Sequence, residues 1–120
     1  MLQDDNGALG QGRDDGSVKY RLRRRAEVSC RLFFFGDDDF EGEGVVREVS
    51  TTGCFGSTTV DMQAGMILKL SLFLPDYTWP LRVDQAIVRW VNGQEFWVEF
   101  ISIQLAQRER VRALVMKAKL

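Results

Sequence analysis

Apolar and polar residues alternate along most of the chain, a pattern of period two that is typical of β-strands with one buried face. The first such run places four apolar side chains on the same face: Val28, Cys30, Leu32 and Phe34. Gly36 and the aspartates after it predict a turn, and residues 42–50 predict a returning strand. These two runs therefore predict a β-hairpin.

Four further segments also have the pattern of strands: 54–60, 66–74, 81–91 and 95–101. In the segment 81–91 the apolar alternation slips by one residue, which predicts a bulge near Gln85. Asn92-Gly93 predicts a two-residue hairpin turn into the last strand.

The period changes near the C-terminus, where four apolar residues follow the spacing of one helix face: Val111, Leu114, Val115 and Ala118. Basic residues occupy much of the remaining surface of this predicted helix: Arg108, Arg110, Arg112, Lys117 and Lys119. Six short strands followed by one helix predict an all-β fold with one helix. We expect a small antiparallel barrel whose open end the helix covers.

Length and composition favour a single folded domain. The 120 residues leave room for one domain, and 45% of them are hydrophobic, enough for one core. Residues 1–17 are rich in glycine and polar residues, so we expect a disordered tail there and assign residues 18–120 to the domain. No stretch approaches the ~20 apolar residues of a membrane span. The acidic N-terminus also lacks the pattern of a signal peptide, so we expect a cytoplasmic protein.

Charge and residue content narrow the classes of function. A net charge of −1 argues against a protein that coats nucleic acid. Histidine, the commonest general base and metal ligand, is absent, so we expect neither enzymatic activity nor a metal or cofactor. Cys30 and Cys54 form no CxxC pair. We expect two buried free thiols, and a disulfide between them stays open.

The basic run at residues 19–25 is the first candidate site. Arg21 and Arg25 stand four residues apart directly before the first strand, and Arg24 lies between them. A guanidinium pairs with phosphate oxygens bidentately, stacks on flat rings and donates twice to the O6/N7 edge of guanine. Taken alone, such a run is more often a solvated arm that attracts anions.

The end of the second strand is the other candidate, with Glu48, Ser50 and Gly53. A carboxylate there can accept hydrogen bonds from N1–H and N2–H of guanine, and the Ser50 hydroxyl can both donate and accept. Gly53 would permit a positive φ or a close approach of ligand to backbone. The plain alternative is a turn whose side chains bond their own backbone.

Taken together, the two elements resemble the signature of the PilZ domain family. That signature is RxxxR, here Arg21 to Arg25, followed by D/N-x-S-x-x-G, here Glu48 to Gly53. A second RxxxR, formed by residues 108–112, falls in the predicted helix and is not assigned to the site.

Later segments also resemble strands of this family: 65–75, 86–90 and 97–100. The resemblance covers about residues 18–118. It implies a six-stranded PilZ-type β-barrel, capped by a C-terminal helix, that binds cyclic di-GMP on its outer surface and signals to a protein effector. Motor, pilus, polysaccharide-synthesis and regulatory machinery are the effectors that the resemblance suggests.

The resemblance also implies roles for the site residues. Arg21 and Arg25 would hold phosphates and stack on or pair with guanine, with Arg24 as an auxiliary. Ser50 would hydrogen-bond the ligand, and Gly53 would keep the turn tight. The basic arm would order around the ligand and so couple binding to a change of shape.

Two positions depart from the family pattern. Glu48 stands where the family has Asp or Asn, so its acceptor lies one carbon further from the backbone. Trp97 stands where the family usually has Gly. We expect this indole to pack under the helix; the alternative is that it lines the ligand surface.

Three other functions compete with this hypothesis. One is a PilZ-like adaptor that no longer binds the nucleotide. Another is a barrel for single-stranded nucleic acid, in which Phe33 and Phe35 beside Arg31 would stack on bases. The last is an enzyme with a hard cation bound by the acidic residues of one loop, although a solvated turn is favoured there: Asp37, Asp38, Asp39, Glu41 and Glu43.

Overall fold

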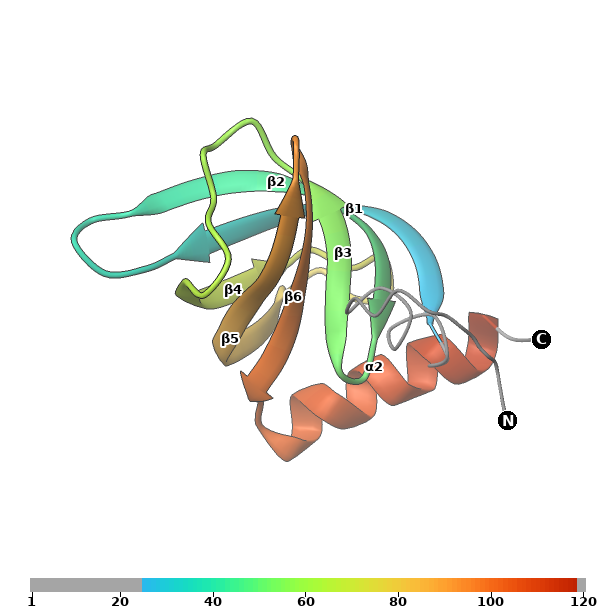
Figure 1. Cartoon of the computed structure of the whole chain (residues 1–120). Helices are drawn as coiled ribbons and strands as arrows, with labels where there is room; N and C mark the ends of the chain where they lie inside the picture. The colour runs from blue at the N-terminus through green and yellow to red at the C-terminus, as the bar shows by residue number, and fades with distance from the viewer. Residues whose placement is uncertain (1–24, 119–120) are drawn as a thin grey trace, which may run out of the picture.

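The computed structural model describes residues 25–118. The tail expected at residues 1–17, and Arg21 and Arg24, lie outside the described residues. Residues 25–118 form six strands and one helix: β1 (Ala26–Phe35), β2 (Glu41–Ser50), β3 (Gly53–Ser57), β4 (Ile67–Leu72), β5 (Leu81–Asn92), β6 (Glu95–Ser102) and α2 (Leu105–Ala118). The strands close into an antiparallel barrel in the order β1-β2-β3-β6-β5-β4 (Figure 1). The predicted fold class is thus confirmed.

The barrel interior is built from the apolar alternation seen in the sequence. Leu32 and Phe34 of β1 pair with Leu72 and Leu70 of β4, and all four side chains are buried. Full burial of one such side chain stabilises the fold by roughly 1.5–3 kcal/mol. The strands are therefore held mainly by their inward faces, which leaves the outward faces available for other chemistry.

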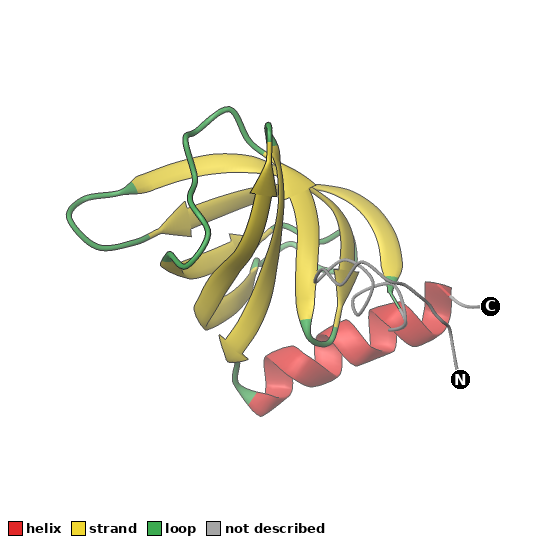
Figure 2. Cartoon of the chain, viewed as in Figure 1, coloured by secondary structure: helices red, strands yellow, loops and turns green. Residues whose placement is uncertain are grey.

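Helix α2 crosses one end of the barrel (Figure 2). Val111 and Val115 are buried in the core and Leu114 is partly buried against it, as the apolar stripe predicted. The side chain of Ala118 lies outside the part of the chain that the structure describes. Among the described residues, no helix is long and apolar enough to cross a membrane.

Arg110 differs from the expectation that it occupies the solvated helix surface, because it is buried. Its Nε and Nη2 donate to the Asp76 carboxylate at 2.8–3.2 Å, and its guanidinium lies 5.1 Å from the centroid of the Tyr77 ring. The hydrogen bonds from Arg110 lower the pKa of Asp76. A charged pair of this kind makes burial of the arginine tolerable and ties the β4–β5 loop to α2.

Several strand boundaries differ from the predicted ones; β4, for example, ends at Leu72 rather than at residue 74. Strand β3 ends at Ser57 rather than at residue 60, because the Thr58 hydroxyl turns the chain: it donates to Glu43 O at 2.8 Å and accepts the Val60 N–H at 3.1 Å. The acidic loop predicted as a turn is one, and Asp38 and Asp39 adopt positive φ angles of 58° and 62°.

The last hairpin turn is shifted by one residue. Asn92 pairs with Glu95, so the two turn residues are Gly93 and Gln94 rather than Asn92-Gly93. Gly93 has a φ of 63°, and a glycine at the first turn position is what a type II′ hairpin requires. The bulge predicted near Gln85 is confirmed by register shifts against both neighbouring strands.

Candidate functional site

Strand β1 carries one extra residue opposite β2. Glu27 pairs with Glu48 and Cys30 pairs with Val46, so two residues of β1 stand opposite Arg47 alone. A bulge of this kind bends the strand and turns side chains that would otherwise alternate. It leaves residues 28 and 29 of β1 beside the outer surface of the barrel.

Strand β2 in turn carries one extra residue opposite β3. Val46 pairs with Gly56 and Glu48 pairs with Phe55, which leaves Arg47 without a partner in β3. Val46 and Val49 are both fully buried, so the two charged residues between them share the outer face. The consecutive bulges thus gather charged side chains at one point of the barrel wall.

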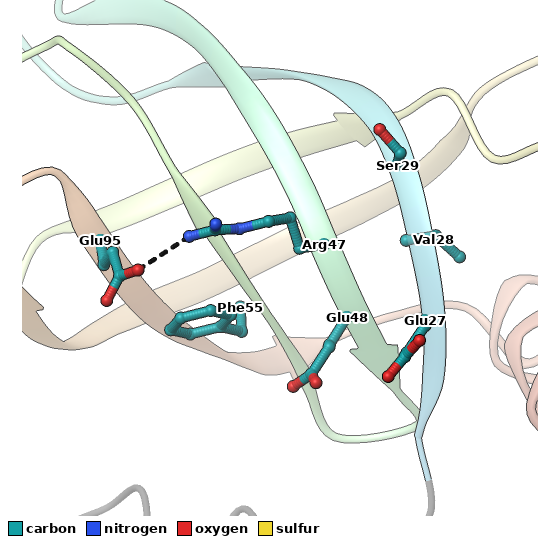
Figure 3. Close-up of a pocket in the computed structure, with 7 residues that line it drawn as sticks. All are labelled: Glu27, Val28, Ser29, Arg47, Glu48, Phe55 and Glu95. Atoms are coloured by element: carbon teal, nitrogen blue, oxygen red, sulfur yellow. Dashed lines mark hydrogen bonds and ion pairs between the residues drawn. The ribbon is translucent and has the colours of Figure 1, made fainter.

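The bulges line an open groove of about 410 Å³ on this outer face, which we call the outer groove (Figure 3). Seven residues from four strands form it: Glu27, Val28, Ser29, Arg47, Glu48, Phe55 and Glu95. Its volume falls within the range of sites for small molecules, about 300–1,000 Å³. Bulges are frequent beside binding sites because they re-aim side chains.

Arg47 is held across the outer groove by two contacts. Its Nη2 donates to Glu95 Oε2 at 2.9 Å, and its guanidinium lies 5.3 Å from the centroid of the Phe55 ring. Figure 3 shows the side chain reaching over Phe55 from β2 to β6. Contact with an aromatic ring and with a carboxylate fixes the orientation of the guanidinium plane.

The other charges of the groove are mainly negative. Glu27 and Glu48 stand directly opposite each other on β1 and β2, a like-charge pairing that disfavours the sheet. Arg25, at the start of the described chain, offsets this: its Nε lies 3.2 Å from Glu48 Oε1. The pairing of β1 with β2 therefore brings together two predicted site residues that are far apart in sequence.

Ser50 is the last residue of β2, directly before the β2–β3 turn, and is fully buried. Its Oγ accepts the Thr52 N–H at 3.2 Å, lies 3.1 Å from Thr52 Oγ1 and is 3.4 Å from the Gly53 carbonyl oxygen, to which it donates. These bonds shape the turn, as the plain alternative for this segment foresaw. A direct bond from Ser50 to a ligand stays a prediction, and it would require the hydroxyl to exchange one of these partners.

Gly53 is required by a close approach rather than by a positive φ, which the described glycines show only at Gly65 and Gly93. A Cβ on Gly53 would lie 2.2 Å from Trp97 Cη2 and 2.2 Å from the Val98 carbonyl oxygen. The group that approaches the Gly53 backbone in this structure is therefore an indole of the same chain.

Trp97 does not pack under the helix, and that expectation is wrong. It pairs with Phe55 on one side and with Trp90 on the other, while its inward neighbours on β6, Phe96 and Val98, belong to the core. Strand alternation therefore directs the indole to the outer face. Trp97 thus points to the outer side of the barrel wall, but it is only 6% exposed and does not line the outer groove.

Of the seven residues of the groove, sequence reasoning identified only Glu48 and missed the other six, among them Arg47, Phe55 and Glu95. A signal for Arg47 was present, because Val46 and Val49 are spaced by three residues within a strand of period two. The same kind of phase slip correctly located the bulge near Gln85. Phe55 and Glu95 had no such signal, since only the strand order β2-β3-β6 brings them beside Arg47.

Comparisons with solved structures agree with the barrel. The Bacillus subtilis inhibitor of motility, MotI/DgrA, superposes with a TM-score of 0.69 at 15% identity, covering 82% of this chain and 51% of that one. MrkH of K. pneumonia gives 0.66 at 16%, covering 92% and 51%. The PilZ domain of CeSA from a cellulose-synthesizing bacterium gives 0.59 at 15%, covering 80% and 98%.

This chain therefore spans about half the length of MotI/DgrA and of MrkH and nearly all of the CeSA domain. At these identities the likeness concerns the fold. No curated protein matches the sequence. The profile of the PilZ domain matches residues 17–117, which is most of the chain. The chain belongs to the PilZ domain family.

Proposed function

We propose that this protein is a receptor that binds cyclic di-GMP on the outer face of its barrel and passes the signal to a protein effector. It acts as a binding domain and not as an enzyme. The observation that carries the proposal is the contact between Arg25 and Glu48, one residue from each half of the family signature, at 3.2 Å. Family membership supports the choice of ligand.

The chemistry of this pair suits the two parts of the ligand. Arg25 supplies a planar cation for a phosphate or for the O6/N7 edge of guanine, and Glu48 supplies acceptors for N1–H and N2–H. Both side chains are about one quarter to one third exposed, so a ligand can reach them. In the absence of ligand each satisfies the other, and binding exchanges their mutual contact for contacts with the ligand.

Arg21 and Arg24 complete the proposed site from the segment that precedes Arg25. Ser50 and Gly53 hold the β2–β3 turn beside it, as their contacts with Thr52 and Trp97 support. We expect the arginine segment to close on the ligand, so that binding alters the surface shown to the effector. Slower tryptic cleavage after residues 21–25 when cyclic di-GMP is added would report this closure.

Isothermal titration calorimetry with cyclic di-GMP tests the proposal. Arg25→Ala should weaken binding by about 2 kcal/mol, roughly 30-fold in Kd, because a charged contact to the ligand is lost. Arg112→Ala is the matched control from the second RxxxR, exposed on α2, and should bind as the wild type does. Absence of heat from a folded wild-type chain would contradict the proposal and favour an adaptor that no longer binds the nucleotide.

Glu48→Asp tests the departure from the family pattern. The shorter side chain restores the family's acceptor position, so we expect cyclic di-GMP affinity to be kept or increased. The same titration measures it, with Glu43→Asp, on the exposed part of β2, as the control. A clear loss of affinity would show instead that this site has adapted to the longer carboxylate.

A further inference from the structure

We infer that Arg47, held over the Phe55 ring and bonded to Glu95, is a stacking platform for one guanine base of the ligand. Arg47 belongs to neither half of the family signature. The inference rests on the proposed function, since it names where a base of cyclic di-GMP lies. It adds a specificity-determining residue to that site.

The guanidinium of Arg47 is planar by its chemistry and is already held in place without a ligand. The Arg47 guanidinium rests against the Phe55 ring at 5.3 Å and donates to Glu95 at 2.9 Å, yet 46% of the Arg47 side chain is exposed. A guanidinium that contacts an aromatic ring on one face can receive a second flat ring on the other. Because the orientation is fixed beforehand, little side-chain entropy is lost when a base stacks.

The carboxylates of the groove favour guanine over adenine. Glu27 and Glu48 line the same groove as Arg47. The Watson–Crick edge of guanine presents two neighbouring donors, N1–H and N2–H, which one carboxylate can accept together. Adenine presents one donor beside an acceptor, N1, which a carboxylate repels. Acidic walls around a cationic platform therefore suit a guanine base better than an adenine base.

The location of Arg47 also supports this role. The bulge in β2 places it next to Glu48, so a base stacked on Arg47 lies within the groove that Glu48 lines, and Glu48 in turn contacts Arg25. Arg89 offers a comparison: it is equally exposed, at 47%, and forms an ion pair of 2.6 Å with Glu99 across β5 and β6. Arg89 does not line the outer groove, so it provides a matched control.

The experiment is calorimetric titration of the full chain with cyclic di-GMP and with cyclic di-AMP. Stacking on a base is worth enough that Arg47→Ala should weaken cyclic di-GMP binding by about tenfold or more. Arg47→Lys keeps the charge and removes the plane, so it should lose nearly as much. The Kd of Arg89→Ala for cyclic di-GMP should stay within about twofold of that of the wild type. Cyclic di-AMP should not bind the wild type.

Each outcome separates the two proposals. If the wild type binds and Arg25→Ala does not, but Arg47→Ala binds as the wild type does, the platform is wrong and the receptor function stands. If Arg47→Lys binds as the wild type does, the charge of residue 47 and not stacking contributes to binding, and the inference that Arg47 is a stacking platform is again wrong. If the folded wild type does not bind cyclic di-GMP, the receptor function fails and the platform with it. Thermal melts of every variant establish that each is folded.

Discussion

Gly53 and Trp97 form a matched pair, in which the absence of one side chain makes room for another. The indole edge and the Val98 carbonyl oxygen both occupy positions that a Cβ on Gly53 would need. The family signature requires a glycine at this point of the turn, and Trp97 is this chain's own addition beside it. The residue that departs from the family pattern is thus accommodated by a residue that keeps to it.

Gly53→Ala should therefore destabilise the fold by about 1–3 kcal/mol, since overpacking at this turn must displace the indole or the backbone. Urea denaturation measures the change in unfolding free energy. Gly36→Ala is the control, because its Cβ would first meet Leu68 Cδ2, the end of a side chain and not backbone, at the longer distance of 3.1 Å. Equal costs for the two substitutions would contradict the close approach that we describe.

The Asp76–Arg110 pair predicts a pH dependence. Because its native pKa is lowered, Asp76 contributes stability above the pKa of an unfolded aspartate, about 4, and that contribution is lost as pH falls through the native value. Asp76→Asn should cost roughly 3 kcal/mol at pH 7, because Arg110 is left buried without its partner.

Urea midpoints between pH 7 and pH 2.5 test this dependence. The gap between wild type and Asp76→Asn should begin to narrow below about pH 4, where Asp76 of the unfolded chain becomes protonated, and should close below the lower native pKa, where Asp76 is protonated in both states. Asp84→Asn, on the exposed face of β5, should show no such narrowing. A gap that stays constant down to pH 2.5 would exclude the ion pair as its cause.

At the scale of elements, helix α2 is joined to the signature turn. Arg108 Nη1 donates to the Thr51 carbonyl oxygen at 2.9 Å, and the Phe100 N–H of β6 donates to Thr52 O at 2.8 Å. The turn between β2 and β3 is thus bound both to the helix and to a strand of the barrel. The second RxxxR, Arg108 to Arg112, lies on α2 as the sequence indicated, and its first arginine has this structural task.

Arg108→Ala should lower the unfolding free energy by about 1.5 kcal/mol, the range of a hydrogen bond from a charged donor. It should also speed amide exchange at the β2–β3 turn, which hydrogen-exchange mass spectrometry measures. Arg112→Ala removes only an exposed pair with Glu109 and should cost less than about 0.5 kcal/mol. Equal exchange at the turn in both variants would argue against the link.

The strands were predictable because each buries one face. The resulting alternation of apolar and polar residues can be read from a short stretch of sequence. The shift in the apolar alternation near Gln85 could also be read from the sequence, and it predicted a bulge. The same kind of shift between Val46 and Val49 is present in the sequence, but no bulge was predicted from it. The neighbours of each outward-facing residue on adjacent strands could not be predicted. Phe55 and Glu95 join Arg47 only through strand order, which no local pattern encodes.

On the scale of the whole molecule, closure of the barrel encloses both thiols. Cys30 and Cys54 are free and buried, so the disulfide that the sequence left open is not formed. Burial raises the pKa of Cys30 to about 11 and that of Cys54 further. Both thiols are therefore protonated near neutral pH, the unreactive form.

Thiol labelling should then report global unfolding. With Ellman's reagent at pH 7.5, both cysteines should react at a single slow rate that follows the unfolding rate as urea is added. Fast labelling of one cysteine in the absence of urea would mean that the barrel opens locally near it. The single variants Cys30→Ala and Cys54→Ala assign each rate to its residue.

The bulges have a consequence for how such a protein can change over generations. Arg47 occupies the extra position of β2, between two valines that face the core, so its replacement disturbs none of the interior packing. Residues 28 and 29 form the corresponding bulge in β1, where two residues stand opposite one residue of β2. Selection, or an engineer, can therefore alter what the outer groove recognises at the exposed positions 29 and 47 while the barrel remains intact. These two positions are the natural starting point for a library with new ligand specificity, whereas Val28 packs partly against the core.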